Sequence, residues 1–236
     1  MSSPPRVLVP GVLLAPGEVV VLPEAEARHL KVSRTAPGAT VVILDGQGGR
    51  AEAVLAAGGR EVVVARRTPP RGEPARRLSV LLGVGEPARL EWAVEKGTEC
   101  GAAAFVLVAA ARSQRAHVAA AAARVERLRR IAAGAVKQCD RTVVPAVLSP
   151  RPLGEVLEAC GGLVLVARPG SPWPGPGLVP AAGASVAVGP EGGFDPVEEA
   201  LHDAAGGLPF GLGTRILRFE TAVVAALARL VGEDDL

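Results

Sequence analysis

The chain has 236 residues, of which 49% are hydrophobic and 21% are charged, close to the average of globular proteins. This length suits one large domain or two small ones, and the composition argues against a disordered chain. The longest uninterrupted apolar run, Ala102 to Ala111, has ten residues. A bilayer-spanning helix needs about twenty, so we expect no integral membrane protein.

The 26 basic and 24 acidic residues nearly balance, but the basic residues are clustered along the chain. Eight basic residues stand against two acidic ones between Arg112 and Arg141, and six arginines against two acidic residues between Arg60 and Arg77. Such an excess is typical of a phosphate-binding surface, and equally of a solvated helix face. Heavy use of Ala, Gly and Pro leaves coding bias as a third explanation.

The cysteines and histidines are few and scattered: Cys100, Cys139, Cys160, His29, His117 and His202. This spacing argues against a disulfide framework and against a metal site, so no metal is expected. The segment from Met1 to Pro5 has no basic patch followed by an apolar stretch. We therefore expect no secretory signal, and a cytoplasmic location.

The first part of the chain, residues 1–72, is predicted to be a small β domain. Gly and Pro punctuate its short β-branched runs, which makes them strand candidates. The expected strands are Arg6–Val9, Glu18–Leu22, Thr40–Leu44 and Glu61–Ala65, with one helix over Pro23–Arg34. The segment Thr68–Pro74 holds three prolines and reads as a linker.

From residue 73 to residue 236 the pattern changes to alternating strands and helices. Expected strands are Leu78–Val84, Phe105–Val108, Leu163–Ala167 and Val186–Val188; expected helices are Glu86–Cys100, Ala116–Cys139 and Glu220–Leu230. Apolar strands separated by helices predict an α/β domain with a parallel sheet covered on both faces. No internal repeat is visible, and Arg168–Pro180 is a Pro/Gly-rich loop.

The segment Gly83–Ala88 follows a strand, opens a helix and superficially fits the dinucleotide-binding pattern G-x-G-x-x-A. That pattern also requires an acidic residue about twenty positions further on. The corresponding region, Ala102 to Ala111, has no acidic residue. An ordinary strand-to-helix turn is therefore the preferred interpretation.

Two later segments favour a ligand site. Gly189-Pro190-Glu191-Gly192-Gly193-Phe194 ends a strand, and Asp195-Pro196 suits the start of a helix. Leu212–Ala222 is a Gly-containing loop with two arginines, leading into an alanine-rich helix. Loops after parallel strands lie at the carboxyl edge of the sheet, where such folds bind ligands. Each segment also has a purely structural interpretation. The first could be a tight turn. In the second, Arg218 could pair with Glu220 while Thr221 caps the helix.

These motifs resemble those of the bacterial ribosomal small-subunit methyltransferase E family. Gly189–Phe194 matches the family's GPEGG loop, and Leu212–Ala222 matches its LGxRILRxETA signature. Weaker matches are Lys96–Gly101, Arg112-Ser113, Gln138–Arg141 with Pro145, and His29–Arg34 with Gly38 and Asp45-Gly46. The chain departs from the family pattern at four positions. Ser33 and Cys100 stand where leucine is usual, Ala111 where glutamate is usual, and Phe219 where threonine is common.

The resemblance implies a fold and a reaction. Family members are SPOUT-class enzymes that use S-adenosylmethionine to methylate N3 of a uridine in 16S rRNA of the small ribosomal subunit. They combine a PUA-like β-barrel with a trefoil-knotted parallel α/β domain, and SPOUT proteins generally build the site at a homodimer interface. The implied cofactor residues are Leu165, Val166, Ala167, Gly189, Pro190, Glu191, Gly192, Gly193, Leu212, Gly213, Ile216, Leu217, Arg218 and Thr221.

The expected chemistry is the loss of the uracil N3 proton and attack of N3 on an activated methyl group. Arg218 is the candidate cation, and Glu191 or Glu220 the candidate base. Because N3 lies on the Watson–Crick edge, the uridine must be unpaired or extruded. The expected RNA contacts are Arg6, His29, Arg34, Arg112 and Arg141.

Three alternatives stay open at this point. A SPOUT methyltransferase could act on another RNA position, such as a ribose 2′-hydroxyl. A protein that keeps the fold could bind RNA or assist ribosome assembly without catalysis. A nicotinamide-dependent oxidoreductase is disfavoured because the ribose-binding acid is missing.

Overall fold

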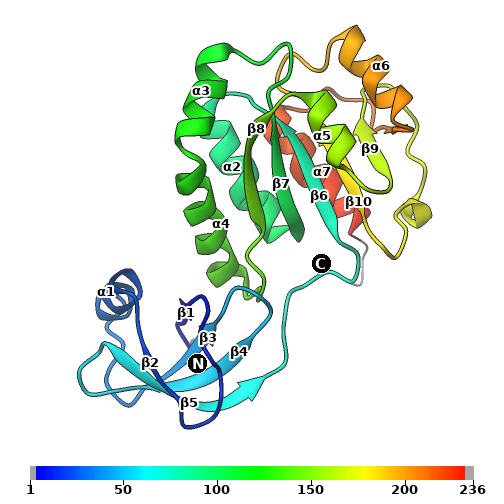
Figure 1. Ribbon diagram of the computed structural model, residues 1–236. Coiled ribbons are helices and arrows are strands. Elements are labelled where there is room, and N and C mark those ends of the chain that lie inside the picture. The colour runs from blue at the N-terminus through cyan, green and yellow to red at the C-terminus, as the bar shows by residue number, and fades with distance from the viewer. Residues whose placement is uncertain (1–3, 232–236) are drawn as a thin grey trace. The chain divides into compact units, whose positions relative to one another are not determined.

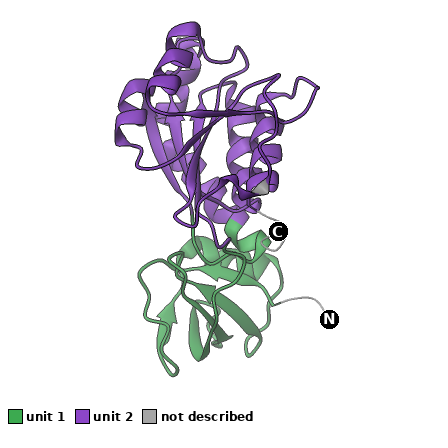
Figure 2. Cartoon of the chain, turned by 90° about the vertical axis from the view of Figure 1, so that its right-hand side faces the viewer, with its two compact units in different colours: residues 1–73, 136–144 green, residues 74–135, 145–236 purple. Residues whose placement is uncertain are grey.

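The computed structural model describes residues 4–231, which divide into two compact units. The first unit contains the residues up to 73 together with 136–144, and the second contains 74–135 and the residues from 145 onward (Figure 2). The expected division into 1–72 and 73–236 differs, because it assigns residues 136–144 to the second domain. The outer ends of both expected domains, 1–3 and 232–236, lie outside the described residues.

The first unit is a curled, mixed five-stranded sheet with one helix (Figure 1). In order across the sheet its strands are β1 (Arg6–Leu8), β3 (Thr40–Leu44), β4 (Arg50–Leu55), β5 (Glu61–Thr68) and β2 (Val19–Val21). Strands β1 and β3 are parallel and the other pairs are antiparallel. Helix α1 (Glu24–Val32) contributes Leu30 to the core that the concave sheet encloses with Val41, Ile43 and Val62.

Ion pairs explain why residues 136–144 belong to the first unit. Arg6 Nε lies 2.8 Å from Asp140 Oδ1, and Arg141 Nη2 lies 2.8 Å from Glu73 Oε2. Glu73 Oε1 also accepts hydrogen bonds from the two backbone N–H groups that follow Arg141, each at 2.8 Å. Because the Arg141 side chain is 3% exposed, its charge is satisfied inside the unit rather than by water.

The second unit contains a six-stranded, entirely parallel sheet. In order across the sheet the strands are β11 (Leu208–Phe210), β9 (Val164–Ala167), β10 (Ala184–Val188), β6 (Leu78–Gly83), β7 (Ala102–Val108) and β8 (Ala146–Arg151). Central strands β6 and β10 are apolar and almost wholly buried. The predicted parallel α/β sheet is therefore confirmed.

Helices cover both faces of this sheet (Figure 1). They are α2 (Pro87–Glu99), α3 (Arg115–Ala123), α4 (Val125–Cys139), α5 (Leu153–Ala159), α6 (Pro196–Ala204) and α7 (Phe219–Leu230), with a 3-10 turn at Pro176–Leu178. On one face Gly97 of α2 brings the helix against the Phe105 ring, close to Leu227 of α7. On the other face Leu153 and Val156 of α5 pack on the strands.

Four regular elements were not predicted, and the expected helix Ala116–Cys139 is two helices separated at Arg124. The unpredicted elements are β4, β8, α5 and β11. Strands β8 and β11 contain Pro150 and Pro209, and both lie at an edge of the sheet, where a missing N–H costs no ladder bond.

The described residues contain neither a membrane-spanning helix nor a cluster of potential metal ligands. No helix within residues 4–231 is long and apolar enough to cross a membrane. In the same residues no group of three or more His, Cys, Asp or Glu side chains is arranged to hold a metal ion.

Candidate functional site

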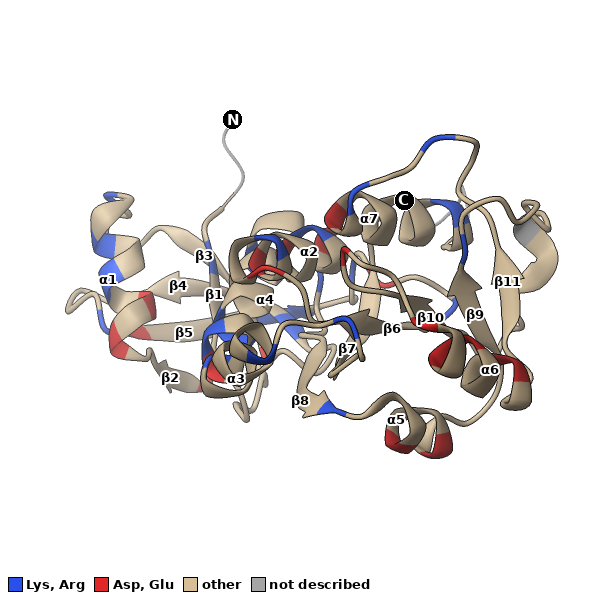
Figure 3. Cartoon of the chain, turned by 90° about the horizontal axis from the view of Figure 1, so that it is seen from above, with Lys and Arg blue, Asp and Glu red and all other residues tan. Residues whose placement is uncertain are grey.

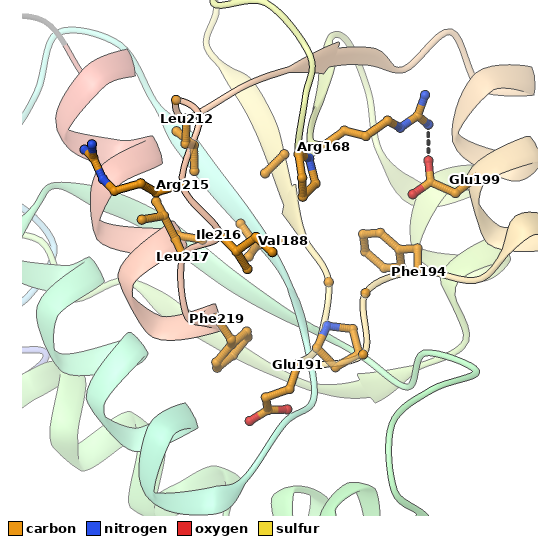
Figure 4. Close-up of a pocket in the computed structure, with 18 residues that line it drawn as sticks. Arg168, Val188, Glu191, Phe194, Glu199, Leu212, Arg215, Ile216, Leu217 and Phe219 are labelled. Carbon is orange, nitrogen blue, oxygen red and sulfur yellow. Dashed lines mark ion pairs between the residues drawn. The ribbon is translucent and has the colours of Figure 1, made fainter.

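A pocket of about 370 Å³ lies where three neighbouring parallel strands, β9, β10 and β11, end at the same edge of the sheet. The loops that follow these strands build its walls (Figure 4). It is lined by Ala167, Arg168, Pro169, Val188, Gly189, Pro190, Glu191, Gly192, Gly193, Phe194, Glu199, Leu212, Gly213, Arg215, Ile216, Leu217, Phe219 and Ala222. The carboxyl edge of an open parallel sheet is where such folds bind ligands.

Most of the expected cofactor residues line this pocket. They are Ala167, Gly189, Pro190, Glu191, Gly192, Gly193, Leu212, Gly213, Ile216 and Leu217. Leu165 and Val166 do not, because both are buried inside β9. Arg218 and Thr221 are exposed at the start of α7 and are not among the lining residues.

The expected cofactor residues did not include the lining residues Phe194, Glu199, Phe219 and Ala222. Arg168 lies at the end of the strand from which cofactor contacts were expected. For Arg168 a signal was present, since it is a charged residue directly after an apolar parallel strand. Phe194 directly follows the glycine-rich loop. Glu199 comes from the first turn of α6, and only the fold brings it to the pocket.

The glycines that resemble a dinucleotide motif accommodate the Pro190-Glu191 turn. A Cβ on Gly83 would lie 2.5 Å from Pro190 N and Cδ, and a Cβ on Gly85 would lie 2.5 Å from Glu191 Oε2. Neither glycine has a positive φ. Close packing against backbone and a proline ring therefore requires glycine at position 83, whereas at position 85 the neighbour is a flexible side chain.

The segment Ala111-Arg112 contacts the glycine-rich loop and the helix that follows it. Arg112 Nη1 donates a hydrogen bond to the carbonyl oxygen of Gly192 at 2.7 Å. Asp195 and Glu198 form a capping box at the start of α6, and Glu198 Oε1 also accepts from Ala111 N at 2.9 Å. The loop between β10 and α6 is thus fixed by main-chain and side-chain contacts from the end of β7.

The Pro/Gly-rich loop after β9 packs against β11 and α7. A Cβ on Gly211 would overlap the carbonyl oxygen of Ser171, so the two loops touch at the backbone. The Trp173 ring meets the Phe210 ring edge-on, with centroids 6.1 Å apart, and the Arg229 guanidinium lies 4.6 Å from the Trp173 ring centroid. These contacts support one wall of the pocket.

A charged cluster with a buried histidine lies at one rim of the pocket. Arg168 is paired with Glu199 (Figure 4). It is also paired with Asp203, at 3.2 Å. The side chain of His202 is fully buried and packs on the Phe194 ring, with centroids 4.7 Å apart. Burial and the positive charge of Arg168 lower the pKa of His202 to about 4, so the imidazole is neutral at pH 7.

Three carboxylates and one arginine meet at another side of the pocket. Glu191 Oε1 accepts a hydrogen bond from Glu86 N at 3.1 Å. Arg89 lies 3.3 Å from the Glu86 carboxylate and 3.8 Å from Glu220 Oε2. Glu220 therefore pairs with Arg89, and the expected alternative of an Arg218–Glu220 pair does not form in the part of the chain described.

The five expected RNA contacts differ in accessibility. His29 and Arg34 are exposed on and just after α1, and Arg112 is exposed as well as bound to the glycine-rich loop. Arg6 is used in an ion pair within the first unit. The expectation that Arg141 contacts RNA is corrected, because its side chain is buried in an ion pair and does not contribute to the surface. In the second unit acidic residues gather on α5 and α6 (Figure 3).

Comparison with known proteins agrees with this geometry. Residues 72–231 match the RNA methyltransferase domain family. A ribosomal RNA small subunit methyltransferase E from Synechocystis sp. is 31% identical over 97% of this chain and 79% of its own length. The protein of that name from Mycobacterium bovis is 32% identical over 89% of this chain and 85% of its own.

A solved structure extends the match to three dimensions. The crystal structure of a ribosomal RNA small subunit methyltransferase E from Neisseria gonorrhoeae, bound to S-adenosyl methionine, is 28% identical to this chain. It superposes with a TM-score of 0.88 over 96% of both chains. On sequence and on structure, the chain belongs to the ribosomal RNA small subunit methyltransferase E family.

Proposed function

We propose that the protein transfers a methyl group from S-adenosylmethionine to N3 of a uridine in 16S rRNA of the small ribosomal subunit. The observation that carries this proposal is the pocket formed by the loops after β9, β10 and β11 in a member of this family. The Neisseria gonorrhoeae relative with S-adenosyl methionine bound has the same fold over nearly its whole length.

The residues of the pocket suit S-adenosylmethionine. The volume of about 370 Å³ lies within the usual range for small-molecule sites. Val188, Leu217 and Phe219 offer apolar walls for an adenosine, and the glycine-rich loop lets a ligand approach main-chain N–H groups.

When bound, S-adenosylmethionine supplies a methyl group whose C–S bond breaks, leaving its electron pair on sulfur, as the N3–C bond forms. We propose that Glu191 accepts the N3 proton, since its carboxylate lines the pocket. Arg218, exposed at the start of α7, is the proposed cation that stabilises the deprotonated uracil. Glu220, paired with Arg89, is a positioning residue in this scheme.

For RNA binding we propose the exposed residues His29, Arg34 and Arg112, together with Arg115 at the start of α3 and Arg124 between α3 and α4. Arginine pairs readily with phosphates, and recognition of this kind rests on RNA shape and backbone. The acidic surface of α5 and α6 would repel phosphates, which supports placing RNA elsewhere on this unit.

We also propose a homodimer, a trefoil knot in the second unit, a cytoplasmic location and a role in ribosome biogenesis. The Ile216 side chain is 92% exposed beside the pocket, and an apolar side chain so placed favours cover by a second copy. The knot follows from membership of the SPOUT class, and the location from the rRNA substrate.

The test is methyl transfer from labelled S-adenosylmethionine to small ribosomal subunits that lack the modification, with mass mapping of the product nucleoside. A 3-methyluridine product supports the proposal. A 2′-O-methylated product would replace it with the ribose reaction, and no cofactor binding would leave a non-catalytic RNA-binding protein. Arg218→Ala should lower turnover much more than cofactor affinity, and the opposite pattern would make Arg218 a cofactor-binding residue.

A further inference from the structure

A second, open pocket of about 440 Å³ adjoins the cofactor pocket. It is lined by Glu86, Arg89, Gln114, His117 and Glu191. Glu191 lines both pockets, so its side chain stands at their shared boundary. A group bound in the second pocket would therefore lie next to the methyl donor's site, with the Glu191 carboxylate beside both of them.

The polar groups of this second pocket have hydrogen-bonding capacity left over. Gln114 is the N-cap residue of α3, yet its side chain does not cap the helix. In the described part of the chain neither the Gln114 amide nor the His117 imidazole has a hydrogen-bond partner. Arg89 uses one nitrogen toward Glu86 and another toward Glu220, and a guanidinium carries five N–H donors.

The edge of uracil that holds N3 presents an acceptor, a donor and an acceptor: O4, N3–H and O2. An amide can donate to one carbonyl oxygen, a guanidinium can donate to another, and a carboxylate accepts from N3–H. We propose that this pocket binds the extruded acceptor uracil, with Gln114 and Arg89 donating to its carbonyl oxygens and Glu191 facing N3. The inference rests on the proposed methyl transfer to N3 and extends it to the base.

Another open pocket, of about 490 Å³, also adjoins the cofactor pocket and competes for this role. Its lining includes Arg112, Arg168, Phe194, Glu199 and Asp203. Arg168 is already paired with Glu199 and Asp203, and Arg112 with the carbonyl oxygen of Gly192. Its lining contains neither Glu191 nor an amide or imidazole side chain, which favours the pocket that contains Gln114 and His117.

Cross-linking tests the location of the base directly. The methylated uridine is first mapped on the small subunit, and a short RNA is then made with 4-thiouridine at that position. Near-ultraviolet irradiation of its complex with the full chain should join the thiobase to a peptide containing Arg89 or Gln114–His117. A cross-link to residues of the competing pocket, to the first unit, or to no peptide at all overturns the proposal.

Variants give an independent readout. Gln114→Ala should lower kcat/KM for the subunit about tenfold or more, while calorimetry shows an S-adenosylmethionine Kd within about twofold of the wild type. Ala200→Gln, which adds a side chain to the lining of the competing pocket, is the control and should leave kcat/KM unchanged. The reverse ranking of the two variants refutes the assignment. If the wild type itself transfers no methyl group to N3, the proposed function fails first, which separates that failure from failure of the base pocket.

Discussion

Gly83→Ala should disable the cofactor pocket without altering any residue that lines it. The new Cβ would lie 2.5 Å from Pro190 N and Cδ and 2.8 Å from the carbonyl carbon of Gly189, whereas ordinary contact begins near 3.4 Å. The turn would have to move by about 1 Å, and its atoms are backbone and a proline ring, which cannot rotate away. Overpacking of this kind costs about 1–3 kcal/mol.

If that cost falls on the binding conformation of the loop, S-adenosylmethionine affinity falls about 5- to 150-fold. Gly85→Ala is the informative partner, because its Cβ meets only the flexible carboxylate of Glu191. It should leave the affinity within about twofold and lower turnover, since Glu191 is the proposed proton acceptor. Gly134→Ala, with no atom within 4 Å of its Cβ, is the control for the substitution itself.

Calorimetric titration with S-adenosylmethionine measures the three affinities, and thermal unfolding checks that each variant is folded. Wild-type affinity in folded Gly83→Ala would show that the loop yields by 1 Å at no cost, and the packing argument would then be wrong. Equal loss of affinity in Gly83→Ala and Gly85→Ala would instead mean that the Glu191 side chain, rather than the Pro190 backbone, controls cofactor binding.

Three further predictions concern single side chains. Because burial lowers the pKa of His202 to about 4 against about 6.5 when unfolded, the unfolded state binds the extra proton between these values, and stability falls as pH drops through this window. Urea unfolding should show a loss of about 2 kcal/mol from pH 7 to pH 5 that His202→Leu abolishes; an unchanged loss in the variant contradicts this. Arg112→Ala should weaken S-adenosylmethionine binding to the free protein about tenfold by releasing the Gly192 carbonyl, whereas an unchanged Kd would leave Arg112 as an RNA contact only. Glu73→Ala removes the carboxylate that contacts the buried Arg141 guanidinium and the two following backbone N–H groups, and should destabilise the first unit by about 3 kcal/mol or more in urea titration; a loss below 1 kcal/mol would show that other groups or water replace the carboxylate.

Sequence patterns predicted those helices and strands whose local residue preferences match their position in the folded protein. The strand Thr40–Leu44 is confirmed to the residue, because its β-branched run is also buried in the first unit. Strands β8 and β11 were not predicted because each contains a proline, Pro150 or Pro209, which argues against a central strand. Both are edge strands, where proline is tolerated, and only the complete sheet shows which strands lie at its edges. The break at Arg124 lies between an alanine-rich helix and one that begins with several arginines, with no Gly or Pro at the junction.

In the candidate site, too, residues with a local sequence signal were predicted, and residues whose role depends on distant parts of the chain were not. Its glycine-rich loop was found from composition and spacing, because glycine is what close backbone approach requires. Arg141 was misjudged because the sequence does not distinguish a surface arginine from one that is paired with a carboxylate 68 positions away. Arg89 was missed for a related reason, as its role depends on Glu220 from α7 being brought beside α2.

The departures from the family motifs can be understood by asking which atoms make each contact. Ala111 replaces a usual glutamate, but its contact to the Glu198 carboxylate uses the main-chain N–H, so the change of side chain leaves that bond intact. Cys100 replaces a usual leucine at the end of α2, where the backbone N–H of the residue donates to Lys96 O at 2.9 Å. Phe219 is different, because its ring is 4% exposed and lines the pocket, so the substitution replaces a hydroxyl by an apolar wall at the cofactor site. Of these three departures, only Phe219 is therefore expected to change how the pocket holds its ligand.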